Sequence, residues 1–475
     1  MRYLLYAIFL CLVAGTCSGD DDLCDKSSCQ ECTNVNTGGG SELCRWCPLS
    51  RSCHVANDRQ ETPCPVELDI DEASECPPDV IQDEFNATAA YHKALLTSVS
   101  YSEYPDLCLE KIQELEPLFD YEIMNDNFIA ERCDDFIFDY NVCVAMVTVS
   151  HSNREIVLSY RGTTQTKQLV DEVLTALFLK KLNFYNHGNV QQYFLKAFNK
   201  LRPCVMDRLK ATINMFPDYR VTVNGHSLGG AMASIMSMYI KVNKTVLKDK
   251  MSLFTFGQPR TGDKTFAVAH DRLVPHSWRI VHHMDIVSHV PLCHPHCDDG
   301  DVTTNYHHGV EIFYDSKSMA DHSEFTVCQA NHDNSCSRKY TKLHSDFIKY
   351  YRENIKLLAQ PLKFMFAYDT DFIEDHRMYY NFPLGSYCVS LLGVDRRRKR
   401  SVGDAFHDGL RDDTCTTLYL NSTTNAWTPR DPALPYTPKP KPTAVSSSST
   451  LKISLICHGL FLIVGNIHFL AKIHF

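Results

Sequence analysis

An excess of positive charge and long uninterrupted apolar runs are both missing from this 475-residue chain. Lys and Arg number 47 against 57 Asp and Glu, a formal net charge of −10, and a negative protein repels nucleic-acid phosphates. Hydrophobic residues make up 44% and charged residues 22% of the chain, which excludes disordered, collagenous and multi-span membrane proteins. At about 150 residues per domain, the length indicates roughly three domains. We therefore expect a multi-domain globular protein that does not bind nucleic acid.

Cysteine, by contrast, is abundant. The chain contains 21 cysteines, more than a reducing compartment would tolerate as exposed thiols. Residues 1–19 combine a basic residue, an apolar run and small residues, the pattern of a secretory signal peptide. Acceptor sequences for N-glycosylation occur at Asn86, Asn243 and Asn421. The sequence thus predicts a secreted, disulfide-bonded glycoprotein.

Residues 20–78 form a predicted cysteine-rich module, because small domains bury too little surface to fold without bridges. Its C-x-x-C pairs, Cys29 with Cys32 and Cys44 with Cys47, would also suit zinc, although an oxidising compartment favours disulfides. The cysteine spacing resembles the plexin-semaphorin-integrin module, which implies a structural or adhesive role and a protein partner. The sequence does not determine the disulfide pairing.

The central segment, residues 85–355, alternates helix-period stretches with short β-rich runs. This alternation predicts an α/β fold with helices on both faces of a central, mostly parallel sheet. The expected strands are residues 144–149, 155–160, 220–223, 251–256, 279–283 and 310–314.

The C-terminal part has a different composition. A predicted extension, residues 356–428, contains the basic run 396–400, for which a proprotein-cleavage site and a plain charged loop are both open. A Pro/Ser-rich linker, residues 429–450, leads to an apolar tail, residues 451–475. Polar residues interrupt this tail and leave it short of the roughly 20 apolar residues that a membrane span needs. Attachment to a membrane through the tail, as a GPI signal or an anchor, stays open.

The strongest chemical motif is a G-x-S-x-G that directly follows a β-rich run. It comprises Gly225, His226, Ser227, Leu228 and Gly229, and a helix-forming stretch comes next. Such a strand-turn-helix elbow exposes a nucleophilic serine, and its glycines let the strand and helix approach closely. We therefore expect Ser227 to be a nucleophile.

A serine hydroxyl needs an imidazole base, which in turn needs a carboxylate to orient it. Asp285 comes directly after the β-rich run 279–283 and is the expected acid. His307 and His308 precede the next run, and their spacing alone does not separate them as the base. The wider histidine cluster also permits a metal site, but we expect no metal, because the nearby Cys293 and Cys297 favour a disulfide in an oxidising compartment.

A tetrahedral oxyanion needs two aimed donors. The backbone N–H of Leu228 is one expected donor, because it directly follows the nucleophile. The loop after the run 155–160 supplies the other candidate, Thr163, which offers a backbone N–H and a hydroxyl.

These motifs together resemble the class 3 lipase family, whose best-known members are secreted fungal triacylglycerol lipases. The resemblance covers residues 85–355 and rests on the segments Tyr160–Thr163, Gly225–Gly230, Phe256–Arg260, Asp285 with Val287, and His307–Glu311. It implies an α/β-hydrolase fold, Ser227 as nucleophile, Asp285 as acid, Thr163 and Leu228 as oxyanion residues, and no cofactor. It also selects His307 over His308 as base. The interval from Asp285 to His307 is short for the family, which leaves the substrate range open.

The resemblance further places a mobile apolar lid at residues 169–179, where a buried core helix is the alternative. We predict a secreted serine hydrolase that cleaves carboxylic esters of lipids at an interface. Two rivals stay open. One is a catalytically silent lipid-binding or adhesion protein, and the other is a carboxylesterase that acts on non-lipid esters.

Overall fold

The computed structural model describes residues 24–35, 44–48, 52–56, 69–73, 76, 85–133, 142–163, 180–246, 250–293, 301–328, 335–354, 371–393, 416–421 and 426–429. The chain divides into two compact units, Met1–Leu434 and Pro435–Phe475, and the second lies outside these residues. So do the predicted signal peptide, the predicted lid 169–179, the basic run 396–400 and the tail. No helix among the described residues has both the length and the apolar character that a membrane crossing requires.

The N-terminal module contains helix α2 (Cys29–Asn34) and the antiparallel strands β1 (Cys44–Cys47) and β2 (Ser52–Val55). Trp46 and Ile70 pack with the cysteines in a small core of their own. Among the residues that the structure describes, three disulfides join these pieces, and their pairs are Cys24–Cys44, Cys29–Cys76 and Cys32–Cys53.

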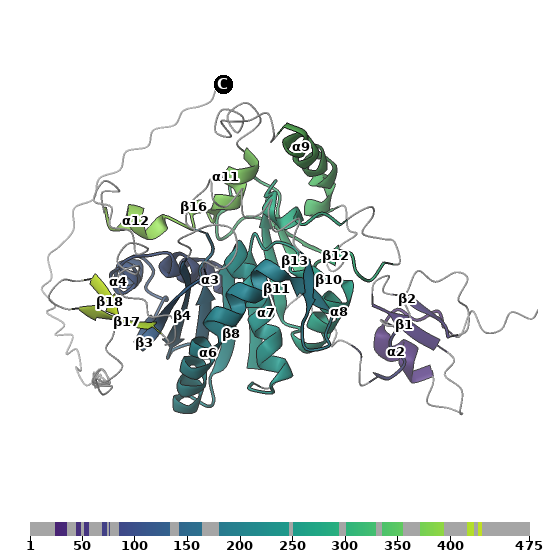
Figure 1. The fold of residues 1–475 in the computed structure, drawn as a ribbon, viewed down its shortest axis with the longest axis horizontal. Helices are drawn as coiled ribbons and strands as arrows, with labels where there is room; N and C mark the ends of the chain where they lie inside the picture. The colour runs from purple at the N-terminus through teal and green to yellow at the C-terminus, as the bar shows by residue number, and fades with distance from the viewer. Residues whose placement is uncertain are drawn as a thin grey trace, which may run out of the picture. The chain divides into compact units, whose positions relative to one another are not determined.

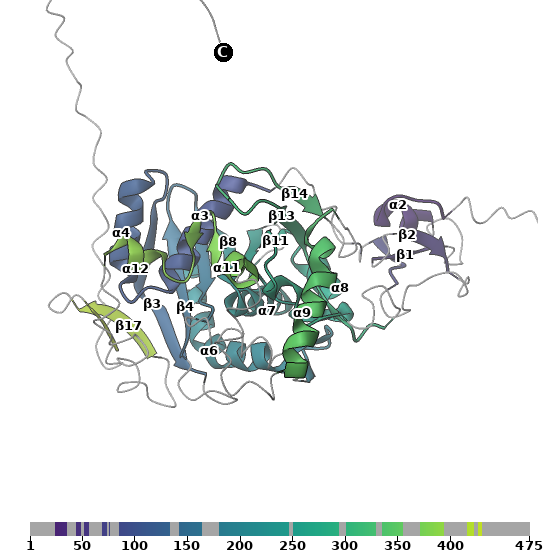
Figure 2. The same ribbon diagram turned by 90° about the horizontal axis from the view of Figure 1, so that it is seen from above.

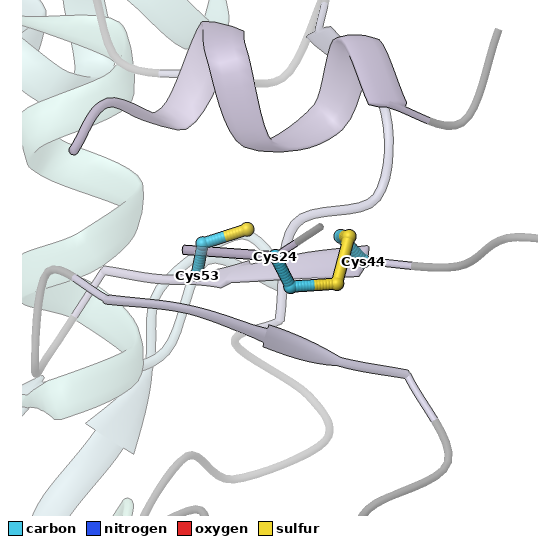
Figure 3. Close-up of side chains that lie close together, drawn as sticks. All are labelled: Cys24, Cys44 and Cys53. Carbon is cyan, nitrogen blue, oxygen red and sulfur yellow. A yellow bond between two sulfur atoms is a disulfide. The ribbon is translucent and has the colours of Figure 1, made fainter. Parts of the chain in front are cut away.

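The disulfides also bear on the zinc alternative for this module. The sulfurs of Cys24, Cys44 and Cys53 lie within 4.8 Å of one another, and Figure 3 shows the bond between Cys24 and Cys44. Cys53 is bonded to Cys32. A metal ligand must be a thiolate, so these sulfurs do not form a cation site while the bridges are closed.

The following segment is built on a ten-stranded sheet in the order β14-β13-β11-β9-β8-β5-β4-β3-β17-β18 (Figure 1). Strands β5, β8, β9, β11 and β13 run parallel in its centre, and antiparallel strands lie at both edges. The strands are β3 (Tyr121–Arg132), β4 (Val142–Ser150), β5 (Glu155–Tyr160), β8 (Arg220–His226), β9 (Met251–Phe256), β11 (Ser277–His282), β13 (Val310–Tyr314), β14 (Thr326–Cys328), β17 (Thr416–Asn421) and β18 (Ala426–Pro429). All six predicted strands are present.

Alternating side chains bury both faces of this sheet. In β5, Ile156 and Leu158 belong to one core and Val157 to the other, as expected when successive residues of a strand point to opposite faces. Burial on both sides is typical of a sheet with parallel strands.

Helices cover the two faces (Figures 1 and 2). The first core lies under α6 (Gln192–Met215), α7 (Leu228–Val242) and α8 (Lys264–Leu273), and the second under α3 (Ala87–Ser100), α4 (Pro105–Leu115) and α12 (Tyr387–Leu391). This arrangement confirms the predicted α/β-hydrolase fold.

Shorter elements decorate the sheet. A second sheet has the order β12-β10-β7-β6, and a hairpin joins β15 to β16. The bounds are β6 (Lys181–Asn183), β7 (Asn189–Gln191), β10 (Gly262–Asp263), β12 (Asn305–Tyr306), β15 (Met378–Tyr379), β16 (Phe382–Pro383), η5 (Val287–His289), η6 (Ser337–Tyr340), α9 (Thr341–Asn354) and α11 (Asp371–Arg377).

Residues beyond 355, where we predicted the hydrolase domain to end, pack into the same body. Tyr379, Phe382 and Leu384 lie in the second core, and a disulfide joins Cys388 in α12 to Cys108 in α4. Strand β17 extends the central sheet by pairing with β3. The segment 371–393 is therefore part of the folded core.

The Cys108–Cys388 bridge closes a loop with a sequence separation of 280, whereas the separation in Cys328–Cys336 is 8. A longer loop loses more chain entropy on closure, so we expect C108A/C388A to lower the free energy of unfolding by about 2–5 kcal/mol. The matched variant C328A/C336A should lower the free energy of unfolding by a smaller amount. Urea titration of both proteins and the wild type measures this, and equal losses would contradict the entropic argument.

Candidate functional site

The predicted elbow is present between β8 and α7. Ser227 has φ 60° and ψ −130°, a region that costs a non-glycine residue about 1–3 kcal/mol. A Cβ on Gly225 would lie 2.4 Å from the carbonyl oxygen of Gly229, so the crossing of strand and helix requires glycine. The Ser227 Oγ is buried and has no hydrogen-bond partner among the described residues.

The predicted acid, Asp285, lies just after β11 and is bound by a histidine from α11. Its two carboxylate oxygens each lie 2.9 Å from Nδ1 of His376. Oδ2 also accepts a 2.6 Å hydrogen bond from the Tyr379 hydroxyl, and Oδ1 accepts one of 2.8 Å from the Val287 N–H. Asp285, His376 and Tyr379 are fully buried.

These contacts fix the charge of Asp285. Burial alone would raise the pKa of its carboxyl, but the neighbouring His376 and the hydroxyl of Tyr379 outweigh burial and lower it. Asp285 is therefore an anion that accepts the Nδ1 proton of His376, which leaves Nε2 of the same ring to accept a proton from elsewhere.

A glycine makes room for this pair. Gly257 follows β9 with φ +56°, and a Cβ there would lie 2.5 Å from Oδ2 of Asp285 and 2.7 Å from Nδ1 of His376. The residue before it, Phe256, accepts the backbone N–H of Ser227 at 2.9 Å. The elbow and the Asp285–His376 pair thus border the same short stretch of chain.

His376 is also tied directly to the elbow. Its ring stacks on that of His226 with centroids 4.6 Å apart, and its carbonyl oxygen accepts Nε2–H of His226 at 2.8 Å. Nε2 of His376, like Ser227 Oγ, is buried without a hydrogen-bond partner among the described residues. An imidazole that a carboxylate orients, held against the residue that precedes a serine, is the kind of group that nucleophilic catalysis by that serine requires.

The expected oxyanion residues border the same point. A Cβ on Gly162 would lie 3.1 Å from Cβ of Ser227, so the loop that continues to Thr163 passes beside the nucleophile. Leu228 opens α7, and the first N–H groups of a helix have no partner inside the helix.

His307, which we expected to act as the base, is placed elsewhere. Its Nε2 donates to the carbonyl of Ser288 at 2.6 Å, and the hydrogen bonds to Asp285 come from His376, Tyr379 and Val287. His308 contacts the Ser234 hydroxyl at 2.6 Å. The structure therefore corrects the expected pairing: the loop before β13 directs both rings into the interior beside α7 and η5, and α11 supplies the histidine that meets Asp285.

The sequence reasoning missed His376 because it ended the domain at residue 355. A usable signal was present, since a histidine downstream of the acid satisfies the order serine, acid, histidine of this fold. The neighbouring aromatic residues Tyr379 and Tyr380 also indicate buried chain rather than a linker.

Asp375, next to His376, fastens α11 to the loop that carries Asp285. Its Oδ2 lies 2.8 Å from Nδ1 of His283 and accepts the Met284 N–H at 3.2 Å. Its carbonyl accepts Nδ1–H of His282 at 3.1 Å. Three bonds on one side and the Asp285–His376 pair on the other leave α11 little freedom to move relative to Asp285.

A second histidine cluster could in principle hold a metal. Ligand atoms of His270, Asp271 and His308 lie within 4.8 Å of one another. The two rings, however, stack with centroids 3.5 Å apart and an interplanar angle of 20°. A metal must lie near the plane of each imidazole that binds it, so nearly parallel stacked rings suit it poorly.

The glycosylation candidates have different surroundings. Asn86 and Asn243 are exposed, but the side chain of Asn86 caps α3 by accepting the Ala89 N–H. Asn421 is the last residue of β17. Modification of the three residues stays a prediction.

The known proteins to which this chain is similar are lipases. A family model described as lipase (class 3) matches residues 157–294, a range that includes Ser227 and Asp285 and ends before His307 and His376. The protein named Lipase ZK262.3 of Caenorhabditis elegans is 33% identical over 259 residues, 52% of this chain and 70% of that protein. Secreted mono- and diacylglycerol lipase 1 of Fusarium solani is 27% identical over 149 residues, 31% of this chain and 42% of that protein. A crystal structure of lipase from Rhizopus microsporus var. chinensis aligns with a TM-score of 0.47 and 21% identity over 64% of this chain and 89% of that one.

Buried histidines predict how stability depends on pH. Burial lowers the pKa of His226 and His270 from 6.5 to about 3 and of His344 to about 4, and the pKa values of His289, His307 and His308 lie well below 6.5. Below pH 6.5 these histidines bind protons in the unfolded chain but stay neutral in the folded chain. The free energy of unfolding is therefore highest above this pH and decreases as the pH falls, by up to about 1.4 kcal/mol per histidine per pH unit.

Urea unfolding between pH 7.5 and 5 measures this slope. H308Q should reduce it by about one proton, and H322Q, at an exposed site, should leave it unchanged. A flat stability profile over this range would contradict the prediction.

Proposed function

Because the chain belongs to the class 3 lipase family, we propose that it hydrolyses ester bonds of lipids through an acyl-enzyme intermediate on Ser227. Family membership confirms the predicted class of enzyme, a carboxylic ester hydrolase of the lipase type. The residue roles, the substrate and the location that follow belong to the proposal.

One observation carries the proposed mechanism: the buried Asp285–His376 pair lies against the residue that precedes Ser227. In acylation, Ser227 Oγ attacks the ester carbonyl carbon while Nε2 of His376 takes the hydroxyl proton. Collapse of the tetrahedral intermediate breaks the bond to the alcohol oxygen, which receives that proton from His376. In deacylation, water repeats these steps, the carboxylic acid leaves, and the proton returns to Ser227.

Asp285 stabilises the imidazolium that forms twice in this cycle, and its two hydrogen bonds from neighbours other than the histidine keep it ionised and oriented. The N–H of Leu228 and the N–H or hydroxyl of Thr163 bind the oxyanion. Loss of one such donor costs about 10²- to 10³-fold in kcat.

The assignment of His376 as base has a direct test. H376A should lower kcat at least about 10³-fold, as removal of a triad member does. H307Q should retain most activity, because a glutamine amide can still donate to the Ser288 carbonyl that His307 contacts. Rates on a soluble short-chain ester, measured beside S227A, decide between them.

Urea unfolding verifies that each variant is folded, because labelling of Ser227 by a fluorophosphonate would itself require the base. The assignment fails if H376A stays active while H307Q is inactive. Loss of both activities in proteins with wild-type unfolding midpoints would also contradict it, because His307 would then take part in the chemistry.

The substrate class follows from the family and from the predicted apolar lid. We infer that the chain cleaves glycerolipid esters, because relatives are named as mono- and diacylglycerol lipases and as triacylglycerol lipases, and that it does so at an interface. Emulsified triacylglycerol, diacylglycerol and phospholipid, each titrated through its solubility limit, form the test panel. Activity that rises sharply above that limit is expected of a lipase acting at an interface.

The two rival functions give other outcomes on this panel. A non-lipid carboxylesterase would cleave soluble esters without a rise at the interface. A silent lipid-binding protein would bind vesicles, and neither a lipid nor a soluble ester would be hydrolysed above the level of S227A.

We propose an extracellular location for this activity. Support comes from the abundance of cysteine, the disulfides among the described residues and the relatives that are named as secreted. A protein partner for the cysteine-rich module and attachment through the tail belong to the same proposal. Mass spectrometry of protein secreted from a eukaryotic host would test the signal peptide, glycosylation and tail together.

A further inference from the structure

Tyr101, at the C-terminal cap of α3, places its hydroxyl between two parts of the proposed active site. The hydroxyl lies 2.9 Å from Nδ1 of His226 and accepts the backbone N–H of Gly162 at 3.0 Å. Tyr101 is buried, and its ring lies 6.1 Å from that of His226. No sequence motif marked this residue, because α3 lies far from the elbow along the chain.

The hydrogen bonds from Gly162 through Tyr101 and His226 to the His376 carbonyl form a network in which each bond has one possible direction. The His376 carbonyl can only accept, so His226 must carry its proton on Nε2. Burial among apolar groups and the neighbouring His376 lower the pKa of His226 to about 3, so its ring is neutral and Nδ1 holds a lone pair. Tyr101 therefore donates to Nδ1 of His226, and its oxygen accepts the N–H of Gly162.

This hydrogen-bond network joins three segments of the proposed site that belong to different parts of the fold. Gly162 precedes the proposed oxyanion residue Thr163, His226 precedes the nucleophile Ser227, and His376 is the proposed base. Every donor in this network faces an acceptor, so a shift of any one of the three segments leaves a buried polar group without its hydrogen-bond partner. A buried polar group that loses its hydrogen-bond partner destabilises the shifted arrangement, and this penalty holds the loop in place.

We propose that Tyr101 is a positioning residue that holds the oxyanion loop through Gly162 and the catalytic imidazole through His226. The inference rests on the proposed function and deepens it. Tyr101 touches none of the reacting atoms. It acts by fixing the distances between the groups that do, and such preorganisation contributes to the transition state more than to substrate binding.

Y101F removes the hydroxyl and keeps the ring. It leaves the Gly162 N–H and Nδ1 of His226 without this partner, so we expect kcat to fall about 10- to 100-fold while KM changes less than about twofold. Y91F is the matched control, because Tyr91 lies on the same helix and donates to Glu116 at 2.8 Å, away from the elbow. Y91F should keep the wild-type kcat.

A double-mutant cycle then tests whether Tyr101 acts through His226. In H226Q the glutamine amide can still donate toward the His376 carbonyl but lacks the aromatic Nδ1 acceptor. Y101F should therefore lower kcat by a smaller factor in the H226Q background than in the wild type. Equal costs in the two backgrounds would overturn the link through His226.

The rate of Ser227 labelling by a fluorophosphonate gives a readout independent of the lipid substrate. Y101F should slow labelling in proportion to its loss of kcat at an unchanged urea midpoint. Wild-type labelling and turnover in Y101F, or a loss that only mirrors its unfolded fraction, would overturn the inference. A wild type that labels but cleaves no lipid ester would refute the proposed substrate and leave labelling to decide on Tyr101, and a wild type that does not label would overturn both.

Discussion

The contact between the Asp285 carboxylate and the His376 imidazole joins positions that are 91 residues apart in the chain. Around it the molecule excludes water, accepts a positive φ at Gly257 and supplies hydrogen bonds from Tyr379 and Val287. A buried carboxylate without such partners would be too costly to keep ionised. The contact between Asp285 and His376 is held in place by the sheet, by the disulfide to α12 and by the hydrogen bonds of Asp375.

The buried polar groups around the site fall into two kinds. Some are fully paired, as in the chain from Gly162 through Tyr101 and His226 to the His376 carbonyl. Others, Ser227 Oγ and Nε2 of His376, have no partner among the described residues. Paired groups resist movement, whereas the unpaired hydroxyl of Ser227 and ring nitrogen of His376 are left available for a reacting group.

Local signals in the sequence predicted the elbow and the acid, because each depends on a few adjacent residues. The glycines around Ser227 and the β-rich run before Asp285 can be recognised from the sequence without knowledge of the fold. The six predicted strands were equally clear, since apolar, β-branched and aromatic residues dominate them. Strand β3 was not predicted, because its register shifts between Ile123 and Phe128 and the polar Asn125, Asp126 and Asn127 interrupt its pattern.

The histidine could not be found in the same way. His307 had the expected local setting, a loop before a strand, and proximity to Asp285 in sequence favoured it. His376 lies on a seven-residue helix, and only tertiary packing brings that helix to the acid. Long-range contacts of this kind leave little trace in the adjacent residues, so a boundary drawn from composition removed His376, the proposed base, from consideration.

The Cys108–Cys388 bridge has a consequence for the order in which the molecule is made. Synthesis delivers residues from the N-terminus, so the nucleophile and the acid exist long before His376 does. The bridge cannot close until Cys388 is available, and it then ties the segment just beyond His376 to α4. A nascent or truncated chain that ends before this point lacks His376, the proposed base, so we expect it to hydrolyse no ester until residues 371–393 have packed into the core.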